Sequence, residues 1–270
     1  MACLTRLGMI LVLGDNEDSF AVGIYDRIRQ GHTECRFISE TDLFASVGFA
    51  SRPGNSQLKN SPDPKKSAHS NEYLRWDAFE VPLDCITGMI VRLNRTWWPP
   101  VDFSLKDQMF IYHETMASWF SVLFSRLNCP IVNRFGLGWW LNDLSYPEVL
   151  RRRLSSRLSL GTTPLGSASA FTARLWPTRA VDRVECVSVY IANKEVIPRN
   201  SEAAVVAEML SGSGTELDGW RLESGLNFCR LDFENNGDFR LAYVEAYPLI
   251  EGESEELVNQ LTGAMAEVFT

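Results

Sequence analysis

Apolar residues recur along the first part of the chain with two different periods, which predict a strand–helix–strand unit. Residues 7–13 form an almost continuous apolar run, typical of a strand buried on both faces of a parallel sheet. A helix should follow, capped by Asp15 or Asn16 and ended by Gly31. Its apolar face is predicted to consist of Phe20, Ile24 and Ile28. Residues 36–38 are the second predicted strand.

The middle of the chain alternates between predicted elements and polar stretches. Residues 51–71 are polar and contain prolines, which indicates a long flexible loop. Residues 86–93 are predicted as a strand, and apolar residues at helical spacing follow within residues 106–127. A short strand is expected over residues 129–133, and a helix should begin at Pro147.

The last third of the chain predicts an antiparallel sheet with helices. Residues 180–197 alternate between apolar and polar positions around Asn193 and Lys194, which predicts a hairpin. Amphipathic helices are predicted over residues 201–210 and 251–269. Residues 161–169 are rich in glycine, serine and threonine, and we interpret them as a loop at a domain boundary.

Residues 226–249 predict a second hairpin with an acid in each strand, Asp232 and Glu245. A tight turn at Asn236 and Gly237 would place Asp232 opposite Leu241, and a longer turn would place it opposite Glu245. Either register leaves both acids on one face, but only the longer turn brings them close enough to share a magnesium ion. The alternative interpretation is an ordinary sheet edge with two solvated acids.

Composition excludes several classes of function. The chain has a net charge of −8, so it does not attract nucleic acid or an anionic membrane as a whole. The apolar run near its start is too short to cross a membrane and lacks a small-residue cleavage site, so we expect a cytoplasmic protein. The 6 cysteines and 3 histidines are scattered, which favours reduced thiols and gives no zinc motif.

The final hairpin resembles the end of the ATP-grasp catalytic domain, where an Asp on one strand and a Glu-x-Asn on the next hold the metal of ATP. The spacing of 13 residues between Asp232 and Glu245 suits that family, whereas Tyr247 stands at the Asn position. The N-terminal half resembles the graspetide (microviridin-type) peptide ligases more loosely. It shares a strand that ends in a basic and aromatic segment, a helix with Glu114, and a short strand that ends in Asn133.

The resemblance implies an α/β fold in two parts. A pre-ATP-grasp-like domain with a parallel sheet is expected over residues 1–150, with residues 51–71 as a flexible loop. A truncated ATP-grasp-like α+β domain with an antiparallel sheet is expected over residues 170–270.

Three departures from the family pattern coincide. Between Asn133 and Thr172 the chain has no lysine to neutralise nucleotide phosphates, this nucleotide-binding part is short, and Tyr247 replaces the metal-binding Asn. The resemblance therefore implies a degenerate protein, a non-catalytic binding or partner subunit associated with peptide or small-molecule modification, with no cofactor. The alternative is an active carboxylate–amine ligase that uses ATP and Mg²⁺, held by Asp232 and Glu245. An unrelated α/β enzyme is a third alternative, although the chain has no Gly-x-Ser-x-Gly motif.

The residues themselves, together with the resemblance, suggest further candidates. The candidate binding partners are a peptide or a partner enzyme. The chain could also assemble into homo- or hetero-oligomers. Residues 151–157 form the densest basic segment, either a phosphate or acidic-peptide site or a solvated helix face. Candidates for nucleotide or anion binding are Arg174, Arg179, Arg183 and Lys194. Candidates for the wall of a binding site are Arg95, Trp97, Trp98 and Tyr247. The alternative for the aromatic and proline segment of residues 94–100 is packing under a loop.

Overall fold

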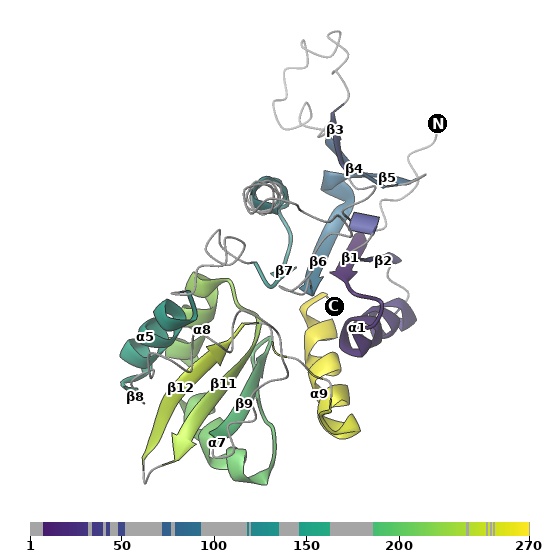
Figure 1. The fold of residues 1–270 in the computed structure, drawn as a ribbon. Coiled ribbons are helices and arrows are strands. Elements are labelled where there is room, and N and C mark those ends of the chain that lie inside the picture. The colour runs from purple at the N-terminus through teal and green to yellow at the C-terminus, as the bar shows by residue number, and fades with distance from the viewer. Residues whose placement is uncertain are drawn as a thin grey trace, which may run out of the picture. The chain divides into compact units, whose positions relative to one another are not determined.

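The computed structural model of the chain places its elements in two compact units (Figure 1). The first contains residues up to 93 together with Val122–Ile131, and the second contains Val132–Val268. The predicted domain limits, 1–150 and 170–270, stay predictions. The structure describes residues 8–31, 34–39, 42–43, 48–51, 72–76, 79–92, 118, 120–134, 146–162, 186–235, 238–246, 248, 250 and 252–269.

A parallel sheet forms the core of the first unit, as the apolar run predicts. Strand β1 (Met9–Gly14) lies between β2 (Glu34–Ser39) and β6 (Ile86–Arg92) and is parallel to both. Strand β7 (Ile131–Val132) follows β6 in the sheet order β2-β1-β6-β7. The residues of β1 between Met9 and Gly14 are buried, which fits a strand covered on both faces.

Helix α1 (Ser19–Gln30) begins later than predicted, because Asp18 is its N-cap in place of Asp15 or Asn16. Its Oδ1 accepts hydrogen bonds from the backbone N–H groups of Phe20 and Ala21 at 3.1 and 3.2 Å. The other oxygen, Oδ2, lies 2.9 Å from both Nε and Nη2 of the buried Arg92 at the end of β6. This long-range partner fixes the capping residue, and local sequence could not show it. The helix ends at Gly31 as predicted.

Three short antiparallel strands extend the first unit and were not predicted. They are β3 (Gly48–Ser51), β4 (Glu72–Trp76) and β5 (Phe79–Pro82), in the order β3-β4-β5, and a 3₁₀ turn, Leu83–Cys85, leads into β6. Residues 52–71 of the predicted loop lie outside the described residues. Within the predicted helix of residues 106–127, the structure describes residues 118 and 120–126 as helical.

The second unit is built on a five-stranded sheet in the order β10-β9-β11-β12-β8. The predicted hairpins are confirmed as β9 (Cys186–Ala192) with β10 (Glu195–Pro198) and β11 (Phe228–Asn235) with β12 (Phe239–Glu245). Strand β8 (Gly161–Thr162) pairs in parallel with β12. The loop predicted from residue 161 was therefore wrong for its first two residues, where pairing with β12 overrides the local glycine and threonine pattern.

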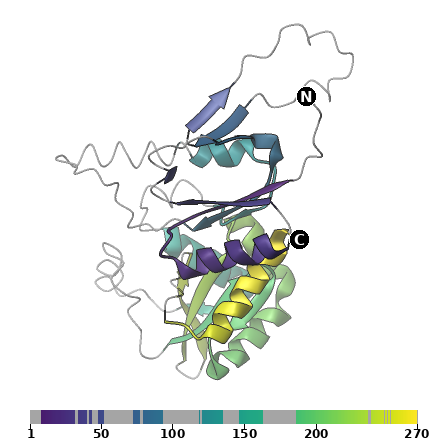
Figure 2. The same cartoon turned by 90° about the vertical axis from the view of Figure 1, so that its right-hand side faces the viewer.

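Helices cover the apolar face of this sheet (Figures 1 and 2). They are α5 (Tyr146–Leu158), α7 (Ala204–Gly212), which follows a 3₁₀ turn at Ser201–Ala203, and α8 (Gly214–Ser224). Helix α8 was not predicted, because glycines interrupt its pattern. The closing helix α9 (Glu255–Ala266) packs against β9 and β10 and continues into a 3₁₀ turn, Glu267–Phe269.

The fold is therefore mixed α/β, with a parallel sheet followed by a mainly antiparallel one, as predicted. Within the described residues, no helix combines the length and apolar character needed to cross a membrane.

Candidate functional site

One face of the second sheet collects polar side chains from its three central strands. The register places Asp232 opposite Ser188 of β9 and Tyr243 of β12. It likewise places Arg230 opposite Tyr190 and Glu245. Because directly paired residues share a face, all six of these side chains project from the same side of the sheet. We call this set the polar face: Ser188, Tyr190, Arg230, Asp232, Tyr243 and Glu245.

A β-bulge decides that the two predicted acids share this face. Near the turn, Phe233 pairs with Leu241, but on the other side of Ala242 the register shifts and Asp232 pairs with Tyr243. Neither predicted register is therefore correct, since Asp232 lies opposite neither Leu241 nor Glu245. The two acids are diagonal neighbours, a relation that separates residues by about 7–8 Å. If the register near the turn continued past Ala242 without a bulge, Val244 would lie opposite Arg230 and Glu245 would project from the opposite face.

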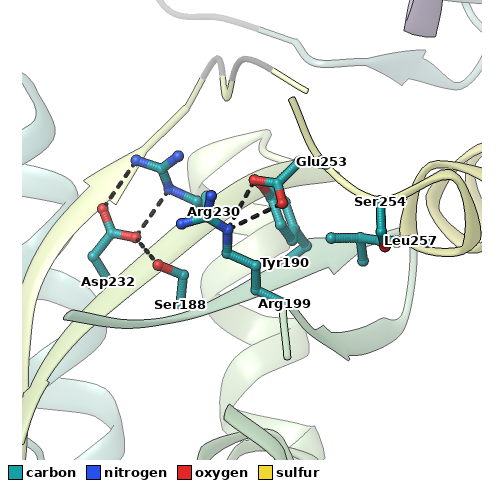
Figure 3. A network of polar contacts seen from close by, with 8 residues as sticks. All are labelled: Ser188, Tyr190, Arg199, Arg230, Asp232, Glu253, Ser254 and Leu257. Carbon is teal, nitrogen blue, oxygen red and sulfur yellow. Dashed lines mark hydrogen bonds and ion pairs between the residues drawn. The ribbon is translucent and has the colours of Figure 1, made fainter. Parts of the chain in front are cut away.

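Asp232 is buried, with 6% of its surface exposed, and both of its carboxylate oxygens have partners (Figure 3). The hydroxyl of Ser188 donates to Oδ1 at 2.7 Å, and Nε of Arg230 lies 2.9 Å from the same oxygen. Nη2 of Arg230 donates to Oδ2 at 3.2 Å. The guanidinium thus pairs with the carboxylate along one edge, which neutralises the buried charge.

Arg230 keeps its own charge in this position. Burial alone lowers the pKa of its guanidinium, but the carboxylate of Asp232 outweighs that effect, with Tyr190 and Glu245 adding to it. The net direction of the pKa of Arg230 is upward from its ordinary value. Sequence reasoning missed this residue, although its position two before Asp232 in a strand already placed both on one face.

A second ion pair, between Arg199 and Glu253, lies beside the first in Figure 3 and holds the residues that lead into α9. Tyr190 donates its hydroxyl to Oε1 of Glu253 at 2.8 Å, and Nε of Arg199 donates to Oε2 at 3.0 Å. The next residue, Ser254, caps α9 by accepting a hydrogen bond from the backbone N–H of Leu257 at 3.3 Å. Glu253 therefore ties the start of α9 to β9 and to the residue that follows β10.

We expect Tyr190→Phe to lower the free energy of unfolding by about 1.5 kcal/mol at pH 8, because a hydrogen bond to a charged group is lost. Burial, followed by Glu253, raises the pKa of Tyr190 above its ordinary value of 10. The Tyr190 hydroxyl thus has a higher pKa in the folded chain than in the unfolded chain, where it is near 10. The difference stabilises the folded chain fully below pH 10, and this stabilisation is lost as the pH rises above 10.

Urea unfolding at pH 8 and pH 10.5 measures this effect. The wild-type chain should lose more stability between these two values than Tyr190→Phe does. Tyr25→Phe, in which the altered ring packs edge-on against Phe37, is the matched control and should behave like the wild type. Equal losses in wild type and Tyr190→Phe would contradict the assignment.

The other predicted residues are not gathered at the polar face as far as the structure describes them. Lys194 is exposed in the turn after Ala192, which pairs with Phe228 at the far end of β9 from Ser188. Seven candidates lie outside the described residues: Arg95, Trp97, Trp98, Arg174, Arg179, Arg183 and Tyr247.

The basic segment of residues 151–157 is not a single surface. Arg151 is buried and donates through Nη1 to the backbone carbonyl of Leu241 at 3.3 Å, next to the β-bulge. Arg157 pairs with Glu223 on α8, whereas Arg152 and Arg153 are exposed. The residues of this segment therefore face in different directions.

In this arrangement Asp232 has partners at both carboxylate oxygens, which disfavours a divalent metal there. Magnesium needs carboxylate oxygens that are free to coordinate it. Both oxygens of Asp232 are engaged by Arg230 and Ser188. Among the described residues, no group of three or more His, Cys, Asp or Glu side chains could hold a metal ion.

Comparison of the fold with solved structures finds two macrocyclases and an ATP-grasp ligase. The macrocyclase MdnC of Microcystis aeruginosa MRC, bound with the precursor peptide MdnA, matches with a TM-score of 0.60 and 9% identity, covering 97% of this chain and 99% of that one. MdnB from the same organism matches with a TM-score of 0.54 and 14% identity, covering 97% and 98%.

A RiPP-associated ATP-grasp ligase of Chryseobacterium gregarium, in complex with ADP and a leader and core peptide, matches with a TM-score of 0.52 and 9% identity, covering 97% and 96%. By sequence, no family model and no curated protein matches the chain. At these identities the likeness concerns the fold. This chain therefore has the fold of the ATP-grasp ligases, and the resemblance seen in its final hairpin is confirmed at that level.

Proposed function

We propose that this chain is a non-catalytic protein of the ATP-grasp fold, which binds a peptide or a partner enzyme and does not form an ATP-dependent bond. This proposal rests on the contacts that Asp232 makes with Arg230 and Ser188. ATP-grasp chemistry needs a metal to neutralise the transferring phosphoryl group. Here the carboxylate expected to hold that metal is buried against Arg230 and Ser188.

The proposed ligand class follows from the fold comparison. MdnC is bound to a precursor peptide, and the Chryseobacterium ligase to a leader and core peptide. A protein that keeps this fold without its metal chemistry could retain peptide binding, because a fold is more robust to substitution than a catalytic site. The departures at Tyr247 and in the lysine-free stretch of residues 107–193 support the same proposal.

A second candidate is an active ATP- and Mg²⁺-dependent carboxylate–amine ligase. One observation favours it. This chain and MdnB cover each other over 97% and 98% of their lengths, so the chain spans as much of the fold as a macrocyclase does. In this case Asp232 would have to leave Arg230 when nucleotide binds, and Asp232 and Glu245 would hold the metal.

Nucleotide binding distinguishes the two candidates. A ligand present at about 100 times its Kd stabilises a protein by about 2.7 kcal/mol, which raises the Tm of a chain this long by about 5 °C or more. We expect about 5 mM ATP with excess Mg²⁺ to change the Tm of the purified chain by less than about 1 °C.

Release of ADP from ATP is the second measurement. We expect the wild-type chain to release ADP no faster than Asp232→Asn or Glu245→Gln. A large ATP-dependent rise in Tm, together with ADP release that both variants abolish, would refute the non-catalytic proposal and establish the ligase.

A further inference from the structure

We infer that the Arg230 guanidinium is the resident counter-ion of the Asp232 and Glu245 carboxylates, that it excludes divalent metals from the polar face, and that its removal opens a divalent-cation site. The inference deepens the proposed function, since it identifies the residue responsible for metal independence. It rests on the position of Arg230, on its charge and on its attachment to the chain.

Arg230 is a neighbour of both acids of the polar face, Asp232 and Glu245. Its backbone lies directly opposite Glu245 and two residues before Asp232 in the same strand. Its guanidinium reaches Asp232 along one edge, with Nε 2.9 Å from Oδ1 and Nη2 3.2 Å from Oδ2 (Figure 3). A metal bound to Asp232 would have to displace the guanidinium from these two oxygens or share them with it.

The charge of Arg230 makes this arrangement persistent. A guanidinium stays protonated at any physiological pH, and the nearby carboxylates strengthen that tendency. A divalent ion that approached Asp232 would meet a like charge in a buried setting, where electrostatic interactions are screened less than in water. A change of pH therefore does not free the carboxylate for metal.

The attachment of Arg230 to the same strand gives it an advantage over a free ion. A group held two residues away has an effective concentration of millimolar or more, because its translational freedom is already restricted. Free magnesium must compete with this tethered cation and must also displace the Ser188 hydroxyl or share Oδ1 with it. We expect the competition to favour the guanidinium.

Arg230→Ala tests the inference with Mn²⁺ as the probe, because Mn²⁺ binds oxygen ligands as Mg²⁺ does and its electron paramagnetic resonance signal falls on binding. We expect Arg230→Ala to bind Mn²⁺ at least about tenfold more tightly than the wild-type chain. About 1 mM Mn²⁺ should also raise the Tm of Arg230→Ala by about 5 °C and that of the wild type by less than about 1 °C.

Three controls isolate the guanidinium. Arg230→Lys keeps a tethered cation and should gain no Mn²⁺ binding. Arg240→Ala removes an exposed arginine from β12 of the same sheet, and it should behave like the wild type. Adding Asp232→Asn to Arg230→Ala removes a carboxylate of the proposed site and should abolish the gain.

Arg230→Met, which keeps the apolar bulk of the side chain, replaces Arg230→Ala if the alanine variant does not melt cooperatively. A folded variant without Arg230 that binds Mn²⁺ no better than wild type would overturn the inference, as would equally tight Mn²⁺ binding by the wild type. These outcomes are separate from those of the proposed function, which depends on ATP binding and ADP release by the wild-type chain.

Discussion

We expect Asn133→Ala to lower the free energy of unfolding by about 4 kcal/mol, because four hydrogen bonds in the core lose their partner at once. Asn133 is 3% exposed, and its amide bonds to backbone groups at the start of β11 and directly after the end of β12. Oδ1 accepts from the N–H groups of Asn227 and Phe228 at 2.8 and 2.7 Å. Nδ2 donates to the carbonyls of Phe228 and Ala246 at 2.6 and 3.1 Å.

This amide holds the start of β11 and the end of β12 together, so its loss should loosen the strands that carry Asp232 and Glu245. A loss of about 4 kcal/mol corresponds to a fall in Tm of about 10 °C for a chain of this size, measurable by calorimetry. Asn133→Asp should be similarly damaging, since its carboxylate would face the carbonyls of Phe228 and Ala246. Asn235→Ala alters an exposed asparagine of β11 and should change Tm by less than about 2 °C. A small effect of Asn133→Ala would show that water replaces the amide.

The second large effect concerns Asp232. We expect Asp232→Ala to lower the free energy of unfolding by about 3 kcal/mol, because it leaves the Arg230 guanidinium, whose side chain is only 12% exposed, without its partner. The matched control is Asp238→Ala, which removes the same charge from an exposed position beside the turn and should be nearly neutral. Urea unfolding of both variants at neutral pH measures the difference.

A double-mutant cycle separates the ion pair from its surroundings. If Arg230 and Asp232 interact mainly with each other, the variant lacking both side chains should be more stable than the sum of the two single losses predicts. Strict additivity would show that each side chain is held by other groups, and it would weaken the assignment of Arg230 as the counter-ion of Asp232.

The parts of the fold that could be predicted are those that local periodicity determines. The apolar run that becomes β1 and the Phe20, Ile24 and Ile28 face of α1 depend on burial alone, so the pattern was sufficient. The alternation in β9 and β11 likewise indicated the antiparallel sheet. The spacing of Asp232 and Glu245 led to the ATP-grasp fold, which the solved structures support.

The site itself depended on contacts that local patterns do not contain. The bulge at Ala242 leaves no mark in the hydrophobic alternation, because Leu241, Ala242 and Val244 are all apolar and buried. Asp18 caps α1 because Arg92 pairs with it across 74 residues of chain. The role of Arg230 required knowing that its side chain turns toward Asp232 rather than toward solvent.

Strand β12 carries one residue more than its pairing with β11 needs, so the final hairpin should tolerate the loss of that residue but not of a second one. Without Ala242, Tyr243 would follow Leu241 in regular pairing opposite Asp232, and Glu245 would stay opposite Arg230. Loss of a further residue between Tyr243 and Glu245 would turn Glu245 toward the apolar layer beneath α5. Natural variants that are one residue shorter here should therefore lack the bulge, and variants shorter by two should carry a compensating insertion in the same strand.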